Sequence, residues 1–314
     1  MLAVIETLFP LIFTIALGMA LAKKNFLGEI FFSELNQLIF WVGLPLLIIK
    51  SLAGASSIPT GTFGVFAVFL FASILLTGLA FSLRHHLHLS RFNLGAFLQG
   101  SYRGNLAFIA IPIVMFAMRH HAESERNEAL TLVIFVFAPT MVYYNVVSVV
   151  ILMKCHAEAG EFSFKKTWAT ISTNPLIASS AIGVILFSLP VQLPAFLMQS
   201  MEYVGNMSGP AALLCVGGGM AQAQIQDQWK GPCAATLLKV FILPCLAYAC
   251  AWPFGLSPIS TFVLLVMSAS PTAVASYVVT KAMKGDENMA SSTIVLSTLL
   301  SVLSLSVVIA WFTP

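Results

Sequence analysis

Long apolar runs recur along this chain, and short stretches that hold most of its charged residues separate them. A helix needs about 20 apolar residues to cross the hydrocarbon core of a bilayer. Runs of about that length can be marked ten times, at residues 3–22, 35–53, 62–83, 93–118, 128–153, 169–188, 204–221, 232–252, 258–283 and 288–312. The pattern predicts an all-α polytopic membrane protein with ten transmembrane helices, numbered here as spans 1 to 10.

Composition supports this class of protein. Hydrophobic residues make up 59% of the 314 residues and charged residues only 9%, whereas a soluble domain carries about 25% charged residues. The net charge of +3 is small and its residues are scattered, which argues against a nucleic-acid partner. No cofactor motif is present in the sequence.

The basic residues predict which way the chain crosses the membrane. Ten of the 15 Lys and Arg residues lie in loops after odd-numbered spans, and three lie in loops after even-numbered spans. Because cytoplasmic loops carry the excess of Lys and Arg, the odd loops are expected in the cytoplasm and both termini outside. The remaining two, Arg103 and Lys239, fall inside spans.

Two of the apolar segments are interrupted by polar and helix-breaking residues. Span 4 contains Gly100-Ser101-Tyr102-Arg103-Gly104-Asn105, with Pro112 seven residues further on, and span 9 contains Ser268-Ala269-Ser270-Pro271-Thr272. Charged and polar residues inside a membrane are costly and usually functional. Interrupted helices at matching places in two halves of a chain are typical of a transporter's substrate site.

The two halves show a weak internal repeat. Three punctuating residues of the first half recur 165 residues later: Pro10 as Pro175, Gly18 as Gly183, and Pro45 as Pro210. Each half contains five spans, and an odd number makes the second half enter the membrane from the opposite side. The sequence therefore predicts a five-helix repeat at 1–153, a cytoplasmic linker at 154–168, and an inverted five-helix repeat at 169–314.

In its motifs the chain resembles the auxin efflux carrier family, in the compact form found in bacteria, which belongs to the bile acid/auxin carrier superfamily. The resemblance covers nearly the whole chain and rests on a combination of short motifs: Gly18, Leu44-Pro45, Arg103-Gly104-Asn105 with Pro112, Thr173-Asn174-Pro175-Leu176, Lys239 with Pro244, Pro271-Thr272-Ala273, and Gly285-Asp286.

This resemblance implies a fold and a mode of action. Spans 4 and 9 would cross where they unwind, spans 1, 2, 6 and 7 would form a scaffold, and spans 3–5 and 8–10 a transport domain that moves like an elevator. Family members are associated with organic anions: auxin in plants, and dicarboxylates such as malonate or malate in bacteria. The resemblance also suggests a homodimer in the bacterial cytoplasmic membrane.

Arg103 is the leading candidate for binding a substrate. By spacing it lies about 15 Å from the end of its span, and guanidinium binds carboxylates bidentately. The alternative is a structural role, in which Arg103 neutralises carbonyl groups at the helix break. Asn105 is expected to cap the second half of span 4 and to touch substrate. Further candidates for substrate contact are Ser101, Tyr102, Ser270, Pro271, Thr272 and Asn145.

Ser270-Pro271 has the residues of a helix start, since serine is a favoured N-cap and proline suits the first helical position. A helix that begins at Pro271 would direct its free N–H groups toward the middle of the membrane, where they can stabilise an anion. A simple proline kink is the alternative. The other residues predicted to break helices or to act in gating are Gly104, Pro112, Pro45 and Pro210.

Three further features leave alternatives open. Lys239 either snorkels to the cytoplasmic surface or has an interior role, and Asn145 either contacts substrate or is satisfied by helix packing. Gly217-Gly218-Gly219 suits close approach of two helices. His85, His86 and His88 form a solvated basic loop in one interpretation, and serve a membrane-embedded enzyme or metal sensor in the other.

A transporter of small organic anions is the function that these features favour, and an enzyme is not expected. No histidine lies inside a span and the two aspartates, Asp227 and Asp286, lie in loops, so intramembrane protease chemistry lacks its residues. The sequence has no phosphate-binding loop for ATP, which predicts a secondary transporter. Carboxylates are missing at the crossing, which disfavours sodium. Proton coupling also lacks an obvious carboxylate in the middle of the membrane, which leaves uniport driven by the membrane potential as an option.

Overall fold

The computed structural model describes residues 2–54, 57–156, 173, 175–189, 193–222 and 229–312. It is 84% helical, and the described residues contain no strand. Most of the predicted linker at 154–168 lies outside the described residues, as does Asn174 of the motif that precedes Pro175.

The helices of the first half are α1 (Leu2–Lys23), α2 (Glu29–Leu38), η1 (Ile39–Gly43), α3 (Leu44–Ala53), α4 (Thr62–Ser82), α5 (Arg91–Tyr102), η2 (Leu106–Ala110), α6 (Ile111–Ala117), η3 (Met118–His120) and α7 (Glu123–His156). Those of the second half are α9 (Pro175–Ser188), α10 (Ala195–Asn206), α11 (Ser208–Gln222), α12 (Lys230–Leu237), η4 (Leu238–Ile242), α13 (Leu243–Ala251), η5 (Trp252–Phe254), α14 (Pro258–Ala269), α15 (Ala275–Ala282) and α16 (Glu287–Phe312).

Five helical stretches among the described residues are long and apolar enough to cross a membrane. They are Glu29–Lys50, Thr62–Ser82, Glu123–Cys155, Lys230–Phe254 and Glu287–Phe312. The segments predicted as spans 4 and 9 are shorter helices, because each is interrupted in its middle: α5 stops at Tyr102 and α14 stops at Ala269.

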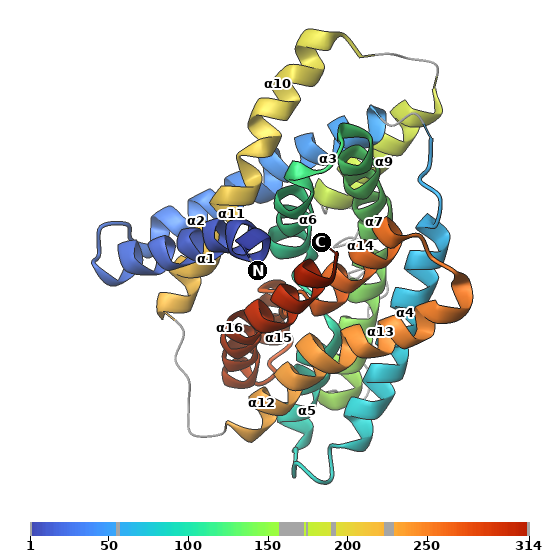
Figure 1. Cartoon of the computed structure of the whole chain (residues 1–314). Coiled ribbons are helices and arrows are strands. Elements are labelled where there is room, and N and C mark those ends of the chain that lie inside the picture. The colour runs from blue at the N-terminus through green and yellow to red at the C-terminus, as the bar shows by residue number, and fades with distance from the viewer. Residues whose placement is uncertain are drawn as a thin grey trace.

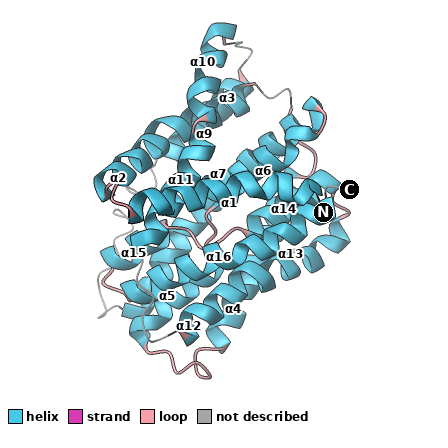
Figure 2. Ribbon diagram, turned by 60° about the vertical axis from the view of Figure 1, so that its left-hand side comes forward, coloured by secondary structure: helices cyan, strands magenta, loops and turns pink. Residues whose placement is uncertain are grey.

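By their packing the helices fall into two groups, whose members can be followed by their labels in Figures 1 and 2. One group contains α1, α2, α3, α9 and α11, with α1 packed on α11 and α3 packed on α9. The other contains α4, α5, α7, α12, α13, α14 and α16, with α4 packed on α13 and α12 packed on α16. The segment η2–α6 contacts both groups, because α6 packs on α7 while η2 packs on α11.

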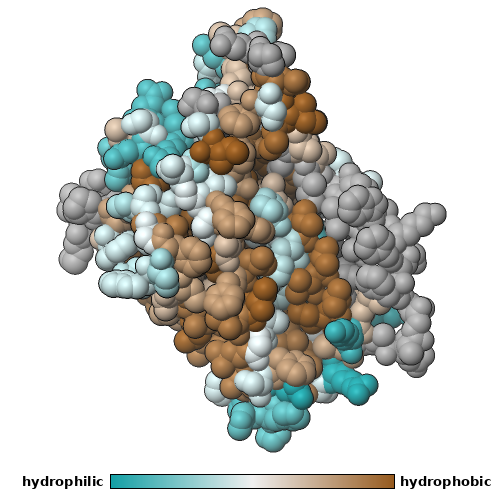
Figure 3. All heavy atoms as spheres, turned by 90° about the vertical axis from the view of Figure 1, so that its right-hand side faces the viewer, coloured by the Kyte–Doolittle hydropathy of each residue, from teal (hydrophilic) through white to brown (hydrophobic). Residues whose placement is uncertain are grey.

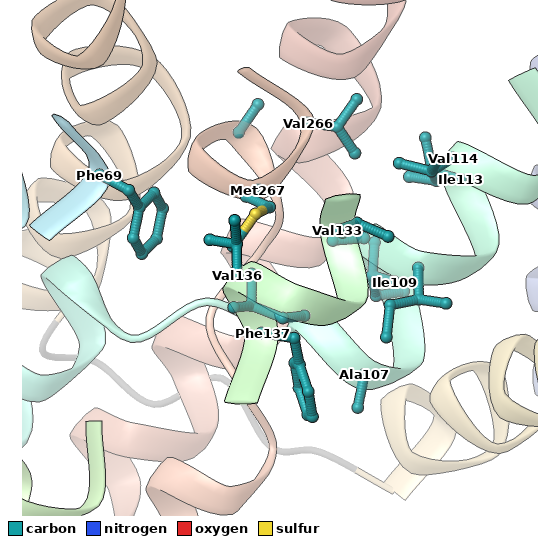
Figure 4. Close-up of a cluster of buried hydrophobic side chains, with 14 of the residues drawn as sticks. Phe69, Ala107, Ile109, Ile113, Val114, Val133, Val136, Phe137, Val266 and Met267 are labelled. Carbon is teal, nitrogen blue, oxygen red and sulfur yellow. The ribbon is translucent and has the colours of Figure 1, made fainter. Parts of the chain in front are cut away.

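Apolar side chains fill the second group. Figure 4 shows Phe69 of α4, Phe137 of α7, Met267 of α14 and Ile109 of η2 in one buried cluster. Apolar side chains also cover much of the outside, as in Figure 3, where hydrophobic residues dominate the middle of one face and hydrophilic residues gather at its lower end. An apolar exterior of this kind suits contact with lipid rather than water.

Glycines let α1 and α11 touch backbone to backbone. A Cβ on Gly217 would lie 1.9 Å from the carbonyl oxygen of Ile15, and a Cβ on Gly18 would lie 2.1 Å from that of Leu214. The close helix approach expected from the glycine triplet is therefore present at Gly217. At Gly219 a Cβ would meet nothing within 4 Å.

Three of the prolines follow π-helical turns. Pro45, Pro112 and Pro244 are each the second residue of an α-helix whose preceding turn, η1, η2 or η4, is π-helical. Proline has no N–H to donate and its ring crowds the preceding turn, and a wider turn accommodates it. The chain therefore remains helical through Pro45, which was predicted to break a helix. Pro210, also predicted to break a helix, is the third residue of α11.

Candidate functional site

The two interrupted segments meet and pair with each other. Residues Arg103 to Asn105 run beside Pro271 to Ala273 as an antiparallel bridge centred on Gly104 and Thr272. The N–H of Asn105 donates to the carbonyl of Pro271 at 2.7 Å, and the N–H of Ala273 donates to the carbonyl of Arg103 at 2.9 Å. Backbone groups that the breaks release are therefore satisfied by the opposite break. We call this pairing the crossover.

Thr272 ties the crossover to two further helices. Its hydroxyl donates to the carbonyl of Gly100 in α5 at 2.7 Å, and its N–H donates to the Ser297 hydroxyl of α16 at 3.0 Å. Thr272 is 1% exposed, so these bonds lie away from water. Its hydroxyl thus holds the two breaks together.

Gly104 is needed because the opposite segment comes so close. A Cβ at this position would lie 2.6 Å from the Ser270 hydroxyl oxygen and 3.4 Å from Cε of Lys239. A side chain here would therefore displace the Ser270 hydroxyl from its present position. The glycine predicted as a helix breaker thus also leaves room for Ser270 at the crossover.

Asn105 caps the helix that follows it, as the sequence predicts. It is the N-cap of η2, and its side-chain oxygen accepts the N–H of Phe108 at 3.4 Å. The side chain is buried. The second half of the segment accordingly begins at Leu106.

The other break differs from the prediction, because α15 begins at Ala275, four residues after Pro271. The Ser270 hydroxyl donates backward to the carbonyl of Met267 at 2.7 Å and so caps the end of α14 instead of the start of the next helix. Pro271 lies in the extended pairing, where its missing N–H is not needed. Ser101 likewise donates to a carbonyl of its own helix, that of Phe97, at 2.8 Å.

Arg103 is buried among neutral partners. It is 2% exposed, and its guanidinium donates to Gln99 Oε1 at 3.2 Å, to Ser148 Oγ at 3.1 Å and to Asn145 Oδ1 at 3.0 Å. Its Nε has no partner among the described residues. Within the described part of the chain no carboxylate pairs with this guanidinium.

Tyr102 and Asn145 belong to the same buried network between α5 and α7. The Tyr102 hydroxyl lies 2.9 Å from Ser148 Oγ, and its ring packs on Tyr143 and Tyr144 at centroid distances of 5.9 and 5.8 Å. Asn145 Oδ1 accepts a hydrogen bond from Arg103, and Asn145 Nδ2 is buried without a partner in the described structure. This arrangement matches the alternative in which packing between helices satisfies Asn145, except that its Nδ2 donor has no partner.

Lys239 lies in the interior and does not reach the surface. Its side chain is 0% exposed, and its Nζ donates to the carbonyl of Ser268 at 2.5 Å. Ser268 is in the last turn of α14, whose carbonyls lose their helical partners at the break. Lysine at the carboxyl end of a helix also complements the helix dipole. A second cation therefore lies beside the crossover.

A cavity of about 750 Å³ opens next to the crossover, between α2 and α11 on one side and η2, α15 and α16 on the other. Phe108, Val274 and Ala275 line it where η2 and α15 begin. No partner among the described residues is found for the backbone N–H groups of Val274 and Ala275. Two residues that line the cavity thus carry unpaired donors at the positive end of a helix.

The residues proposed from sequence do not line the cavity. The cavity lining does not include Arg103, Asn105, Ser101, Tyr102, Ser270, Pro271, Thr272 or Asn145. Most of their hydroxyl, amide and guanidinium groups bond between α5 and α7 or to the backbone of their own segment, and the Thr272 hydroxyl bonds to α5. The unpaired donors beside the cavity belong to the backbone of Val274 and Ala275, which the side-chain pattern does not mark.

Sequence reasoning missed three residues of the network. Gln99, Ser148 and Ser297 are fully buried, and each bonds to a residue of the crossover or to Arg103. Single Gln and Ser residues in apolar segments are common. The spacing of Gln99 four residues before Arg103, on one helix face, was the available signal.

The loop histidines do not assemble a metal site in the described structure. No group of three or more His, Cys, Asp or Glu side chains that could hold a metal ion is found among the described residues.

Comparison with known proteins agrees with the membrane character of the helices. A family model described as a membrane transport protein matches residues 3–309. The search of curated proteins gives no match for this chain. A match over nearly the whole length, together with the apolar helices, makes this a multi-pass membrane protein. The chain belongs to the membrane transport protein family, that of the auxin efflux carriers.

Proposed function

We propose that this protein is a secondary transporter of a small organic anion, which binds at the crossover end of the cavity and is exposed alternately to the two sides of the membrane. The observation that carries the proposal is the pairing of two interrupted helices beside a 750 Å³ cavity in a chain of a transport family. Interrupted helices whose N-termini face a cavity are a recurrent way to bind anions in membranes.

The electrostatics of the crossover favour an anion. Arg103 and Lys239 are both buried next to it, and no described carboxylate pairs with either. The Val274 and Ala275 N–H groups add the positive end of α15. In the described conformation Arg103 acts through its charge, because its NH1 and NH2 groups bond to α5 and α7. The bidentate contact expected from sequence would require the guanidinium to turn.

The architecture that supports transport is a pair of inverted five-helix repeats with ten spans, in which α5–α6 and α14–α15 are the crossing pair. Two equivalent packings support it. Gly18 of α1 lies against Leu214 of α11, and Gly183 of α9 lies against Leu52 of α3. This is expected if span 1 is repeated as span 6 and span 2 as span 7, because the contact between spans 1 and 7 then corresponds to the contact between spans 6 and 2. The group with these four spans is the proposed scaffold, and the other helices form the moving transport domain of an elevator.

The excess of basic residues in odd loops supports a bacterial cytoplasmic membrane protein with both termini outside. In that orientation the cavity, whose wall includes Glu29 and Glu287 at the starts of α2 and α16, opens toward the cytoplasm. The described conformation is then inward-facing. A homodimer through the scaffold group completes the proposal.

Uptake by liposomes that contain the purified protein tests this function. We expect a panel of radiolabelled mono- and dicarboxylates to include a transported anion, and Arg103→Ala to reduce its uptake at least about a hundredfold, the loss when a key anion-stabilising charge is removed. Replacing His85, His86 and His88 together with Gln should leave uptake unchanged.

The opposite pattern would contradict the proposal. Uptake that survives Arg103→Ala but disappears with the histidine variant would favour a membrane-embedded enzyme or metal sensor. Imposed pH, sodium and voltage gradients on the same liposomes identify the coupling ion. Since no described carboxylate lies at the crossover, we expect the membrane potential to drive uptake without sodium.

A further inference from the structure

Besides the large cavity, a groove runs between α1 and α16. Its volume is about 330 Å³, within the range of about 300–1,000 Å³ that is typical of ligand sites. Lining residues such as Ala16 and Leu299 are exposed, so the groove opens to the outside of the molecule. The two helices belong to different groups, because α1 packs on α11 and α16 packs on α12. The groove therefore lies on the boundary between the two groups.

The wall of this groove is apolar except at one end. Among the described residues only Thr298 and Lys23 contribute polar side chains to the lining. The Thr298 hydroxyl donates to the carbonyl of Ile294, in its own helix, at 2.7 Å, so its donor is used within α16. Lys23 is exposed and is the last residue of α1. An apolar groove thus carries one positive charge, at the end of a transmembrane helix.

The groove has the length of one leaflet of a bilayer. Along α1 its lining extends from Ile12 to Lys23, and eleven residues of helix span about 16 Å. Half of the hydrocarbon core of a bilayer is about 15 Å thick. In the predicted orientation Lys23 is at the cytoplasmic end of its span, so the groove runs from the level of the inner headgroups to the middle of the membrane.

The charge at the end of the groove lacks a counter-charge within the described structure. The ion pairs found among the described residues include neither Lys23 nor the neighbouring Lys24, which is also exposed. Basic residues at the cytoplasmic ends of transmembrane helices attract the phosphate groups of anionic lipids. An anionic headgroup above a hydrocarbon chain is the chemistry that complements this site.

We propose that the groove binds an anionic phospholipid of the inner leaflet, with one acyl chain between α1 and α16 and the phosphate at Lys23. Such a lipid would contact both groups of helices. It would also reach Thr298, which lines the large cavity as well as the groove. The site is thus distinct from the general lipid shell, and the inference does not depend on which solute the protein transports.

Mass spectrometry of the intact, full-length protein in detergent tests the inference, because it counts bound lipids. The probes are dioleoyl phosphatidylglycerol, which is anionic, dioleoyl phosphatidylcholine, which has the same chains and no net charge, and glycerol phosphate, which has no chains. We expect the first phosphatidylglycerol to bind at least about fivefold more tightly than phosphatidylcholine, since one lysine near an anionic headgroup contributes about that factor. Glycerol phosphate should not bind at concentrations at which phosphatidylglycerol saturates the protein.

One pair of substitutions tests the charge. The double variant Lys23→Gln, Lys24→Gln should bring the affinities for the two phospholipids to within about twofold of each other. The matched control is Lys230→Gln, Lys284→Gln, because these two lysines are also exposed and predicted to be cytoplasmic but do not line the groove. The control should keep the preference for phosphatidylglycerol.

A second pair of substitutions tests the groove itself. Ala16→Leu, Ala20→Leu fills the space for the chain, and displacing about two methylene groups should weaken phosphatidylglycerol binding about tenfold. Ala178→Leu, Ala181→Leu is the matched control, because it enlarges two exposed alanines of α9 that do not line the groove. It should leave the affinity unchanged.

Three results would overturn the inference. They are equal affinity for the two phospholipids, binding of glycerol phosphate as tight as that of phosphatidylglycerol, and an unchanged affinity for phosphatidylglycerol in the double variant of the lysines or in that of Ala16 and Ala20. None of them bears on the proposed function, which uptake by liposomes tests separately.

Discussion

At the scale of single residues, the protein holds two cations in its interior with neutral partners. Arg103 is bound by an amide of α5 and by hydroxyl and amide groups of α7, and Lys239 is bound by a carbonyl at the end of α14. Buried charges without counter-charges are costly. A permanent cost of this kind is consistent with a binding site whose counter-charge arrives with the substrate.

Removing the charge of Lys239 is expected to weaken substrate binding. Lys239→Gln retains a donor for the Ser268 carbonyl but removes the positive charge beside the crossover. It should raise the KM for the transported anion about tenfold, which corresponds to a loss of about 1.4 kcal/mol of binding free energy. The measurement is the initial uptake rate against anion concentration. Lys230→Gln, an exposed lysine at the start of the preceding α12, should leave KM unchanged, and equal effects at both positions would refute a local role.

At the scale of elements, the crossover depends on bonds between segments that are far apart in the sequence. Gly104 allows the contact, and Thr272 fixes it to α5 and α16. The α1–α11 contact depends in the same way on Gly217 and Gly18. Each of these contacts has a substitution that tests it.

Thr272→Val should destabilise the protein by about 1–3 kcal/mol, because it leaves the buried carbonyl of Gly100 without its donor. The shape of the side chain is conserved, so packing changes little. Thermal unfolding in detergent measures the effect. Thr140→Val is the control, since the equally buried Thr140 donates to a carbonyl of its own helix, that of Val136. A comparable loss of stability there would show that the bond of Thr272 contributes no more than an ordinary bond within a helix.

Gly217→Ala should separate α1 from α11, because the added Cβ would lie 1.9 Å from the Ile15 carbonyl oxygen. Overpacking of this kind costs about 1–3 kcal/mol or more. Gly219→Ala adds the same methyl group two residues away, where nothing lies within 4 Å. A lower melting temperature is expected for the first variant only, and similar melting temperatures for both would contradict the backbone contact.

The sequence predicted the elements of the site better than their details. The breaks at Arg103–Asn105 and at Ser270–Pro271, and the cap at Asn105, follow from residue chemistry that acts locally. The start of α15 at Ala275 does not, because the extended pairing of Thr272 with Gly104 competes with helix formation at Pro271. Nor could the pattern reveal the neutral partners of Arg103, since Gln99 and Ser148 become partners only through packing of α5 on α7.

At the scale of the whole molecule, two groups of helices enclose a cavity that ends at the crossover. The first group supplies α2 and α11 to its wall, and the second supplies α16, on which α15 packs as a further part of the wall. A second cavity of about 620 Å³ lies elsewhere between the groups, where Lys50 of α3 and Ser124 of α7 are part of its lining. In an elevator, movement of the second group along the first would open the crossover to either side.

The predicted orientation assigns these two cavities to opposite sides of the membrane. Single cysteines at Ser124 and Lys284, introduced after the native cysteines are replaced, should label from opposite sides in intact cells. Ser124→Cys is expected to react with a membrane-impermeant maleimide from outside, and Lys284→Cys only after permeabilisation. The reverse result would place both termini in the cytoplasm, and labelling of both from one side would refute the predicted topology.

The central claim, that an organic anion binds where α15 begins, is tested most directly by protection of a cysteine at that position. Ala275→Cys, in the same cysteine-free background, places a thiol at the exposed start of α15 in the cavity. The transported anion at saturating concentration should slow its alkylation at least about tenfold, as expected when a bound ligand occupies more than nine-tenths of the sites. Ser124→Cys in the second cavity should react at an unchanged rate. Alkylation of Ala275→Cys at the same rate with and without the anion would contradict the account.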